Sequence, residues 1–346
     1  MTYKEAAGER LLLELRARDA WDQRDYVAGQ RLAEELASAA RDAGDELGWW
    51  NATFLISECL RKQGLVHEAR GVAEVLAEHH LTAQSKALGA RVSTLLSLAL
   101  QGTGELAPAV AAARQAVVDA SGNVDDVKVE VGARNALIAA LADSDQLELA
   151  WQECLALDAL LRPEPSSQTT GMAFWAIGNV AFLLGHIPEG VSYHGLAAKN
   201  LSPSNDLDLW ARFNRASAAL RLKAGVVAPE TLECIERAEL ASSIVGGTER
   251  DRLELKLTRG QWLVLTGQYD AAIEQLKGVI GQKQLLATHT AADAHFLLGQ
   301  ALSARGDSAR ADANFRVSEG LFLQSGAKDR ASAARALVHG AQDVPG

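Results

Sequence analysis

The stretch Arg259-Gly260-Gln261-Trp262-Leu263-Val264-Leu265-Thr266-Gly267-Gln268-Tyr269-Asp270-Ala271-Ala272-Ile273-Glu274-Gln275-Leu276 carries the pattern that organises the chain. It predicts the end of one helix, a tight turn at Gly267 and the start of a second helix. Gly260 and Ala272 are small residues at which the two helices can approach closely. The stretch therefore predicts a hairpin of two antiparallel helices.

The turn position of Gly267 recurs throughout the sequence. The equivalent residues are Arg24, Gly64, Gly104, Asp145, Gly185, Gly225, Gly267 and Gly306. Neighbouring members of this series lie 39 to 42 residues apart. A period this steady over eight units indicates a solenoid of stacked hairpins. Glycine, or Asp in one unit, suits a residue that ends a helix in the left-handed conformation.

Two further positions test this register, because both hold small residues in nearly every unit. Seven residues before the turn lie Ala17, Ser57, Ser97, Ile138, Gly178, Ala218, Gly260 and Gly299. Five residues after the turn lie Gly29, Ala69, Ala109, Ala150, Gly190, Glu230, Ala272 and Ala311. Ile138 and Glu230 are the exceptions. We interpret Ala228-Pro229 as an insertion with Pro229 in the first turn of a helix, which moves the buried face by one residue to Ile235 and Ala238.

The predicted fold is an all-α, right-handed solenoid of about eight hairpins and a C-terminal capping helix, forming a single domain over residues 1–346. The expected hairpins are 5–43, 48–80, 85–120, 126–162, 168–202, 206–245, 249–284 and 289–325, and the expected cap is 328–342. The Pro-containing segment Arg162–Gln168 is interpreted as a joint between hairpins and not as a domain boundary.

Bulk composition narrows the class of protein. The net charge of −10 disfavours a nucleic-acid-binding surface, which needs a basic stripe. No window reaches the ~20 apolar residues of a membrane span, and the N-terminus does not resemble a signal peptide. Cys59, Cys154 and Cys234 lie far apart without a CxxC pair, which predicts buried thiols in a reducing cytoplasm. Abundant Ala and an excess of Arg over Lys are typical of a GC-rich bacterial source.

The pattern of Leu257–Leu276, and of His295–Phe315 with Gly299, Gly306, Ala311 and Phe315, resembles the tetratricopeptide repeat. The resemblance covers about residues 10–325. Units of about 40 residues are similar to the sensor arrays of bacterial regulators, including peptide-pheromone receptors. Those regulators also carry an effector domain, and we expect no helix-turn-helix in this chain, because too few residues precede Arg10 and none follow Gly346.

The resemblance implies that the first helix of each hairpin lines a concave groove. We take the positions thirteen, ten and six residues before the turn as groove-facing. The second and third units then offer Asn51, Phe54, Glu58, Arg91 and Thr94. In the fourth to sixth units the predicted peptide- or partner-binding residues are Asn135, Met172, Trp175, Asn179, Arg212 and Arg215. Asn amides can bond a peptide backbone, two arginines can hold a carboxylate, and Trp with Met can accept an apolar side chain.

These observations predict a non-enzymatic, cytoplasmic scaffold that binds a peptide or a partner helix. The alternative is the peptide-sensing component of a bacterial regulator that acts with a separate effector. A third class, self-assembly through the ends of the solenoid, stays open, and a homodimer is one oligomeric state compatible with the sequence. No HExxH, phosphate loop, GxSxG or dinucleotide fingerprint is present, so we expect no catalytic site, cofactor or metal. We expect neither direct nucleic-acid binding nor membrane association.

Overall fold

The computed structural model describes residues 3–121, 127–161, 167–246 and 248–338. Within these ranges the regular structure consists of helices, and no strand occurs among them. The chain divides into two compact units, Met1–Pro165 and Ser166–Gly346. The division falls in the proline-containing segment that the sequence marks as a joint, and residues 162–166 of it lie outside the described ranges. A single continuous domain over 1–346 stays a prediction.

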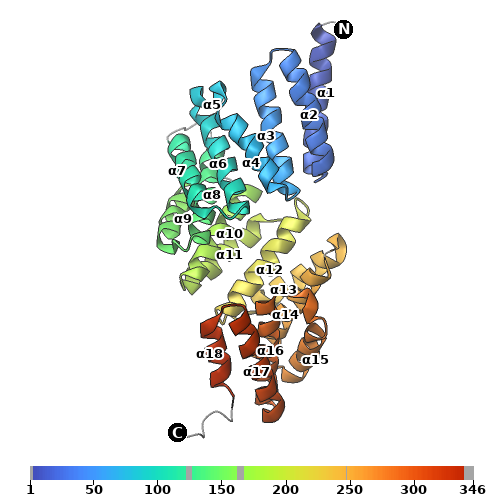
Figure 1. Ribbon diagram of the computed structural model, residues 1–346, viewed down its shortest axis with the longest axis vertical. Helices are drawn as coiled ribbons and strands as arrows, with labels where there is room; N and C mark the ends of the chain where they lie inside the picture. The colour runs from blue at the N-terminus through green and yellow to red at the C-terminus, as the bar shows by residue number, and fades with distance from the viewer. Residues whose placement is uncertain (1–2, 122–126, 162–166, 247, 339–346) are drawn as a thin grey trace. The chain divides into compact units, whose positions relative to one another are not determined.

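The first unit is a row of antiparallel helix pairs (Figure 1). Each pair consists of a first helix, a short turn and a second helix. The second helix packs against the first helix and against the next pair. The helices are α1 (Tyr3–Asp22), α2 (Tyr26–Asp42), α3 (Glu46–Lys62), α4 (Val66–Ala77), α5 (His80–Gln84), α6 (Lys86–Gly102), α7 (Leu106–Ala120), α8 (Val127–Asp143) and α9 (Leu147–Leu161). The short α5 lies between the second and third hairpins and was not predicted.

The second unit repeats the arrangement. Its helices are α10 (Gln168–Leu183), α11 (Ile187–Asn200), α12 (Leu207–Lys223), α13 (Pro229–Val245), α14 (Glu249–Leu265), α15 (Tyr269–Ile280), α16 (Thr288–Ala304), α17 (Ser308–Gln324) and α18 (Lys328–Ala336), with a 3₁₀ turn at Lys283–Leu285. Helix α18 packs on α17, and Ala331 and Ala334 are buried there beside Phe322. The predicted cap 328–342 thus begins as expected and its helix ends at Ala336, while residues 339–342 lie outside the described ranges.

The eight turn residues all adopt the left-handed conformation, with φ between 58° and 82°. Arg24 and Asp145 do so although they carry side chains, at φ 61° and 58°. At Gly267 the amide donates to the carbonyl of Val264 (3.1 Å), and the amide of Gln268 donates to that of Leu263 (2.8 Å). These two bonds form a Schellman motif, which satisfies carbonyls at the end of the first helix. The positions identified from the period are therefore confirmed as the turns of the hairpins.

The two helices of a hairpin come closest at the small residue seven positions before the turn. A β-carbon added to Gly260 would lie 2.8 Å from Leu276 Cδ2, and one added to Gly299 would lie 2.6 Å from Phe315 Cε1. In the second hairpin the Ser57 hydroxyl donates to the carbonyl of Ala69 (2.7 Å), which joins the two small positions directly. The predicted close approach of the paired helices is confirmed at these sites.

In each hairpin, the size of the residue seven positions before the turn is matched by the size of the residue sixteen positions further along the chain. Where the first position is Gly178, Gly260 or Gly299, the second is large: His194, Leu276 and Phe315. Where the first position carries a side chain, the second is small: Ala33, Ala73, Ala113, Cys154 and Cys234. All of these second residues are buried. A larger residue at one position of the pair thus goes with a smaller residue at the other, as a close-packed interior requires.

The two irregular units keep this packing by local adjustments. Ile138 is fully buried, and its partner position holds the small Cys154. In the sixth hairpin Glu230 is exposed and Thr231 is buried in its place, with its hydroxyl donating to the carbonyl of Val226 (3.0 Å). Pro229 begins α13, and Ile235 and Ala238 are buried. The interpretation of Ala228-Pro229 as a one-residue insertion is confirmed.

Gly299→Ala should destabilise the protein, because the new methyl group would meet the ring of the buried Phe315. Overpacking typically costs about 1–3 kcal/mol, and the better helix propensity of Ala returns up to about 1 kcal/mol. The matched control is Gly320→Ala in α17, where nothing lies within 4 Å of the new β-carbon. Urea unfolding should show a net loss for Gly299→Ala and a neutral or stabilising effect for Gly320→Ala. Equal effects would contradict the packing described here.

Candidate functional site

A pocket with a volume of about 690 Å³ lies in the first unit. We call it the N-terminal groove. Its lining includes residues thirteen, ten and six positions before the turn on α1, α3 and α6, namely Leu11, Glu14, Arg18, Asn51, Phe54, Glu58 and Arg91. The repeat places these side chains on one continuous surface, because the same helical positions of successive first helices lie side by side.

Ion pairs within the first unit neutralise most of the charge in the N-terminal groove. Arg18 pairs with Glu14 (2.6 Å), and Arg10 pairs with Asp45 (3.3 Å). Glu58 accepts from Arg61 (3.2 Å), which lies one turn further along α3. A groove whose charges are already paired does not select a strongly acidic or basic ligand. Leu11, Phe54 and Leu55 supply apolar surface between these pairs.

Arg91 links the aromatic and polar parts of the N-terminal groove. Its guanidinium lies 4.4 Å from the ring centre of Phe54 and 4.9 Å from that of Trp50. Its Nη1 also donates to Asn51 Oδ1 (3.2 Å) on the preceding hairpin. Stacked on the rings and bonded on its edge, the guanidinium is held in one orientation across two hairpins.

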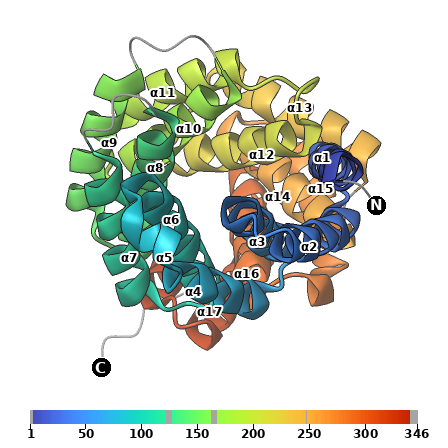
Figure 2. The same cartoon turned by 90° about the horizontal axis from the view of Figure 1, so that it is seen from above.

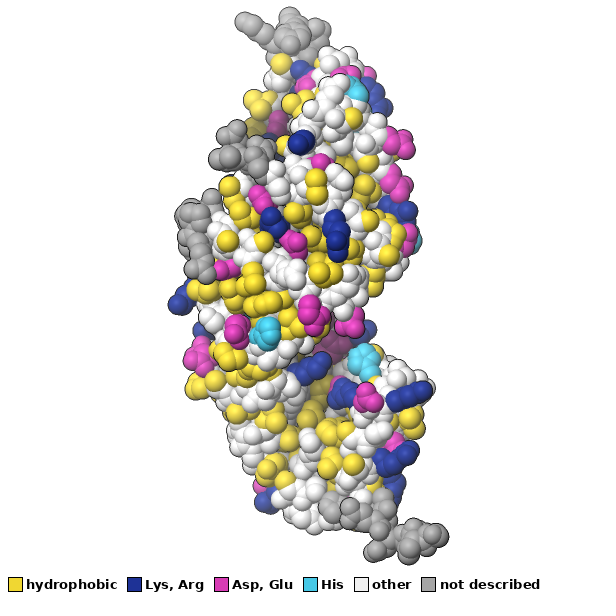
Figure 3. Space-filling model, turned by 90° about the vertical axis from the view of Figure 1, so that its left-hand side faces the viewer, with side chains coloured by type: hydrophobic (Ala, Val, Ile, Leu, Met, Phe, Trp, Pro, Cys, Tyr) yellow, Lys and Arg dark blue, Asp and Glu magenta, His cyan; other side chains and the backbone are white. Residues whose placement is uncertain are grey.

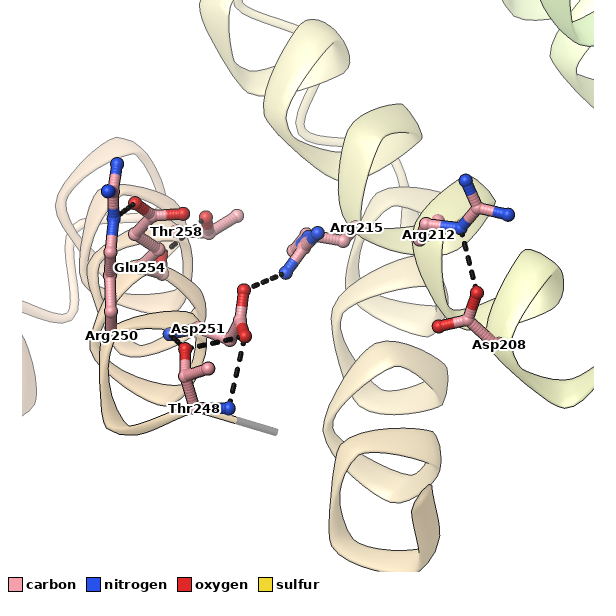
Figure 4. A network of polar contacts seen from close by, with 8 residues as sticks. All are labelled: Asp208, Arg212, Arg215, Thr248, Arg250, Asp251, Glu254 and Thr258. Atoms are coloured by element: carbon pink, nitrogen blue, oxygen red, sulfur yellow. Dashed lines mark hydrogen bonds and ion pairs between the residues drawn. The ribbon is translucent and has the colours of Figure 1, made fainter. Parts of the chain in front are cut away.

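The predicted arginine pair lies on α12 in the second unit, beside a pocket of about 130 Å³. Figure 4 shows Arg215 reaching toward Asp251 on α14 (2.9 Å), whereas Arg212 is turned away to Asp208 on its own helix (3.0 Å). Hydrogen bonds from Thr248 and Arg215 lower the pKa of Asp251, so that carboxylate is ionised at neutral pH. An incoming carboxylate would therefore have to replace Asp208 or Asp251.

The predicted residue Asn179 is engaged with the core of the fifth hairpin. Its Oδ1 lies 3.1 Å from Nε2 of the buried His194, and His194 Nδ1 lies 2.8 Å from the hydroxyl of Ser217. A β-carbon on Gly178 would meet the imidazole at 2.3 Å, so the ring fills the space between α10 and α11. His194 is thus the hydrogen-bonded core residue that its interhelical position indicates.

The remaining predicted residues lie on two different units. Met172 and Trp175 are on α10, where Met172 is exposed and Trp175 packs edge-on against Phe213 at 5.8 Å between ring centres. The indole Nε1 of Trp175 has no hydrogen-bond acceptor among the described residues. Asn135 lies on α8 in the first unit, and its buried Oδ1 likewise has no donor there. All six residues remain a predicted site.

The N-terminal groove follows from the same register, although the residues predicted to bind a peptide lie in the fourth to sixth units. Of the five residues predicted to face the groove in the second and third units, Asn51, Phe54, Glu58 and Arg91 line the pocket and Thr94 does not. What the sequence did not reveal is the contribution of α1, where Leu11, Glu14 and Arg18 hold the equivalent positions. These three residues lie thirteen, ten and six positions before the turn residue Arg24, so the register of the repeat predicts them as well.

All three cysteines are unpaired and buried, and burial raises the pKa of Cys59 and Cys154 to about 12 and also raises that of Cys234. The prediction of buried thiols is confirmed. Among the described residues no group of three or more His, Cys, Asp or Glu side chains could hold a metal ion. None of the described helices has the length and apolar character needed to cross a lipid bilayer.

Three solved structures are similar to this chain over nearly its whole length. They are the APC/C hetero-tetramer Cut9–Hcn1 (12% identity, TM-score 0.62), a Rap protein complexed with Competence and Sporulation Factor (11%, 0.58), and a signal-transduction ATPase with a tetratricopeptide repeat sensor from Pyrococcus horikoshii (15%, 0.66). The matches cover 99%, 97% and 95% of this chain, and 56%, 96% and 50% of the respective structures. The chain thus spans about half the length of two of them.

No protein-family model and no curated protein sequence matches the chain. The structural matches nevertheless agree with the hairpins and turns described above. The described helices form an all-α repeat solenoid, and this fold is similar to that of the three structures, one of which contains a tetratricopeptide repeat sensor. At these identities the likeness defines the fold and leaves the function to be argued from the residues.

The buried His194 should make stability depend on pH. Burial, with a contribution from the nearby Arg221 guanidinium, lowers its pKa to about 3 from an ordinary value of 6.5. Between these values the unfolded chain binds the additional proton, so the stability contribution is fully present above pH 6.5 and is lost as pH falls toward 3, by up to ~1.4 kcal/mol per pH unit. Chemical denaturation between pH 6.5 and 5 should show a steeper loss for the wild type than for His194→Gln.

The exposed His67 provides the control, because His67→Gln should keep the wild-type slope. Burial also lowers the pKa of His295, so part of the wild-type slope should persist in the His194 variant. Identical slopes for the wild type and His194→Gln would show that His194 is not buried as a neutral ring.

Proposed function

We propose that this protein is a non-enzymatic scaffold that binds an extended peptide segment of a protein partner. The observation that carries the proposal is the N-terminal groove, in which three successive first helices present apolar, amide and charged side chains on one surface. A linear segment can cross several repeats in such a groove and contact each in turn. Asn51 offers an amide to a peptide backbone, while Leu11 and Leu55 offer contact to apolar side chains.

The chemistry of the N-terminal groove favours a particular kind of segment. Most of its carboxylates and guanidinium groups are held in ion pairs, so a ligand of mixed polarity with apolar anchors matches it better than a highly charged one. The net charge of −10 and the interspersed acidic and basic side chains on the face in Figure 3 favour a protein partner over nucleic acid. The buried, unpaired cysteines favour a reducing, cytoplasmic setting.

The predicted residues of α10 and α12 are the second candidate contact region for a peptide. Met172 is exposed, and beside it Trp175 holds a buried indole N–H with no acceptor among the described residues. Arg212 and Arg215 would contribute after exchanging their present carboxylate partners. Asn135 is the predicted contact of the first unit, and its Oδ1 is buried without a donor in the described ranges.

A second candidate function is peptide sensing on behalf of a separate effector. The solved structures that resemble this chain include a Rap protein complexed with Competence and Sporulation Factor and an ATPase with a repeat sensor. A sensor would differ from a passive scaffold in changing shape on binding. Low-angle X-ray scattering with a selected peptide should then show a changed radius of gyration, and an unchanged value would favour the scaffold.

Selection from a random linear peptide library should yield peptides that bind the full chain. For these peptides the variant Asn51→Ala/Arg91→Ala should raise the Kd at least tenfold, since truncating a central hot-spot residue typically costs about 2 kcal/mol or more and about 1.4 kcal/mol corresponds to tenfold. The variant Trp175→Ala/Arg215→Ala tests the second region in the same titration. Val118→Ala, an exposed residue of α7, is the control.

Thermal melts of each variant separate lost binding from lost folding. Failure to select any peptide, or equal affinity of all variants for the selected peptides, would contradict peptide binding at these sites.

A further inference from the structure

The first helix of the chain exposes two neighbouring leucines, and the corresponding helices bury the position of one of them, Leu12. Leu12 and Leu15 of α1 are 48% and 51% exposed. Gly8, Leu12, Leu15 and Asp19 follow each other at helical spacing, and we call them the α1 end face. Figures 1 and 2 show α1 at the outer edge of the first unit, beside α2 and with no other helix of that unit beyond it.

The repeat shows what this face is built to contact. Leu12 lies twelve residues before its turn, and the residues at the same position in the other seven hairpins are at most 5% exposed. These residues are Ala52, Val92, Ala133, Ala173, Phe213, Leu255 and Ala294. Val92 packs beside Leu76 of α4, and Ala133 packs beside Ala116 and Ala120 of α7. In each of these cases the cover is the second helix of the preceding hairpin, so Leu12 occupies an inter-hairpin position that no helix of the described chain covers.

The charges beside the face identify the helix that fits it. Glu9 and Arg16 are both exposed on the same flank of α1. In an antiparallel pair of two α1 helices centred between Leu12 and Leu13, Glu9 of each copy lies opposite Arg16 of the other. Two reciprocal pairs of opposite charge then flank the leucines, as an isologous two-fold contact requires.

The ends of the helix match in the same arrangement. Asp19 lies near the C-terminal end of the α1 end face, and an antiparallel neighbour brings it opposite the first turn of the other α1. The N-terminal end of a helix favours a carboxylate. Gly8 adds no side chain, and a β-carbon there would have no neighbour within 4 Å in the single chain, so a second helix can approach closely.

We infer that two copies of this chain associate through antiparallel packing of their α1 helices. The contact joins Leu12 and Leu15 of the two copies and pairs Glu9 with Arg16 in both directions. Because each copy contributes a single helix, the buried surface is smaller than that of an obligate dimer, and association should depend on concentration in the micromolar range or above. Leu12 and Leu15 are absent from the lining of the N-terminal groove, so the contact leaves that site open.

Sedimentation equilibrium of the full chain over a wide concentration range tests the contact. The wild type should pass from monomer to dimer, and Leu12→Gln/Leu15→Gln should weaken dimerisation at least tenfold. Since both leucines are half exposed in the single chain, this variant should fold and melt as the wild type does. The matched control Val75→Gln/Val118→Gln changes two residues of similar or greater exposure on α4 and α7 and should dimerise normally.

A charge exchange distinguishes the antiparallel α1 pair from any other dimer. Glu9→Arg and Arg16→Glu should each weaken association, and the double variant Glu9→Arg/Arg16→Glu should restore it. A wild type that stays monomeric at all concentrations, or a double variant as weak as the single ones, would overturn the inference. A dimer unaffected by the leucine substitutions would do the same.

Discussion

The close contact between the two helices of each hairpin is the constraint on which the rest of the structure depends. It is made by a residue seven positions before the turn and another sixteen positions further on, and their sizes compensate. Gly178, Gly260 and Gly299 face the large residues His194, Leu276 and Phe315, while Ala or Ser at the first position goes with Ala or Cys at the second. The left-handed turn residue fixes the register that brings the two together.

This contact decides which surfaces of each first helix remain for other uses. One side is occupied by the second helix of its own hairpin, and the position of Val92 and Ala133 is covered by the preceding hairpin. The positions thirteen, ten and six residues before the turn are left, and all three on α1 and α3, together with Arg91 on α6, line the N-terminal groove. At α1 no preceding hairpin covers Leu12 in the described chain, which leaves the surface that we assign to a second copy. The proposed binding and the proposed self-association thus follow from one repeat geometry.

The sequence predicted the repeat well because its determinants are local and recur at a fixed interval. Even Glu230, which breaks the pattern, was explained by the insertion at Pro229. The state of the candidate site was harder to predict, because it depends on side-chain partners from other hairpins. Arg215 forms an ion pair with Asp251, and Asn179 forms a hydrogen bond with His194. Both contacts depend on hairpin geometry that the residue types alone do not specify. Short α5 was missed for a similar reason, since His79 caps it through a local bond to the amide of Leu81 that no repeat position signals.

The central claim is that paired volumes close each hairpin, and a double-mutant cycle at Gly260 and Leu276 tests it most directly. Leu276→Ala alone should cost about 2–5 kcal/mol as a buried large-to-small change. In that background Gly260→Ala should become neutral or stabilising, because the added methyl group enters space that the leucine has left. In the wild-type background the same change should destabilise the protein. If the two substitutions are additive to within about 0.5 kcal/mol in the unfolding free energy, the positions do not share one volume and the account is contradicted.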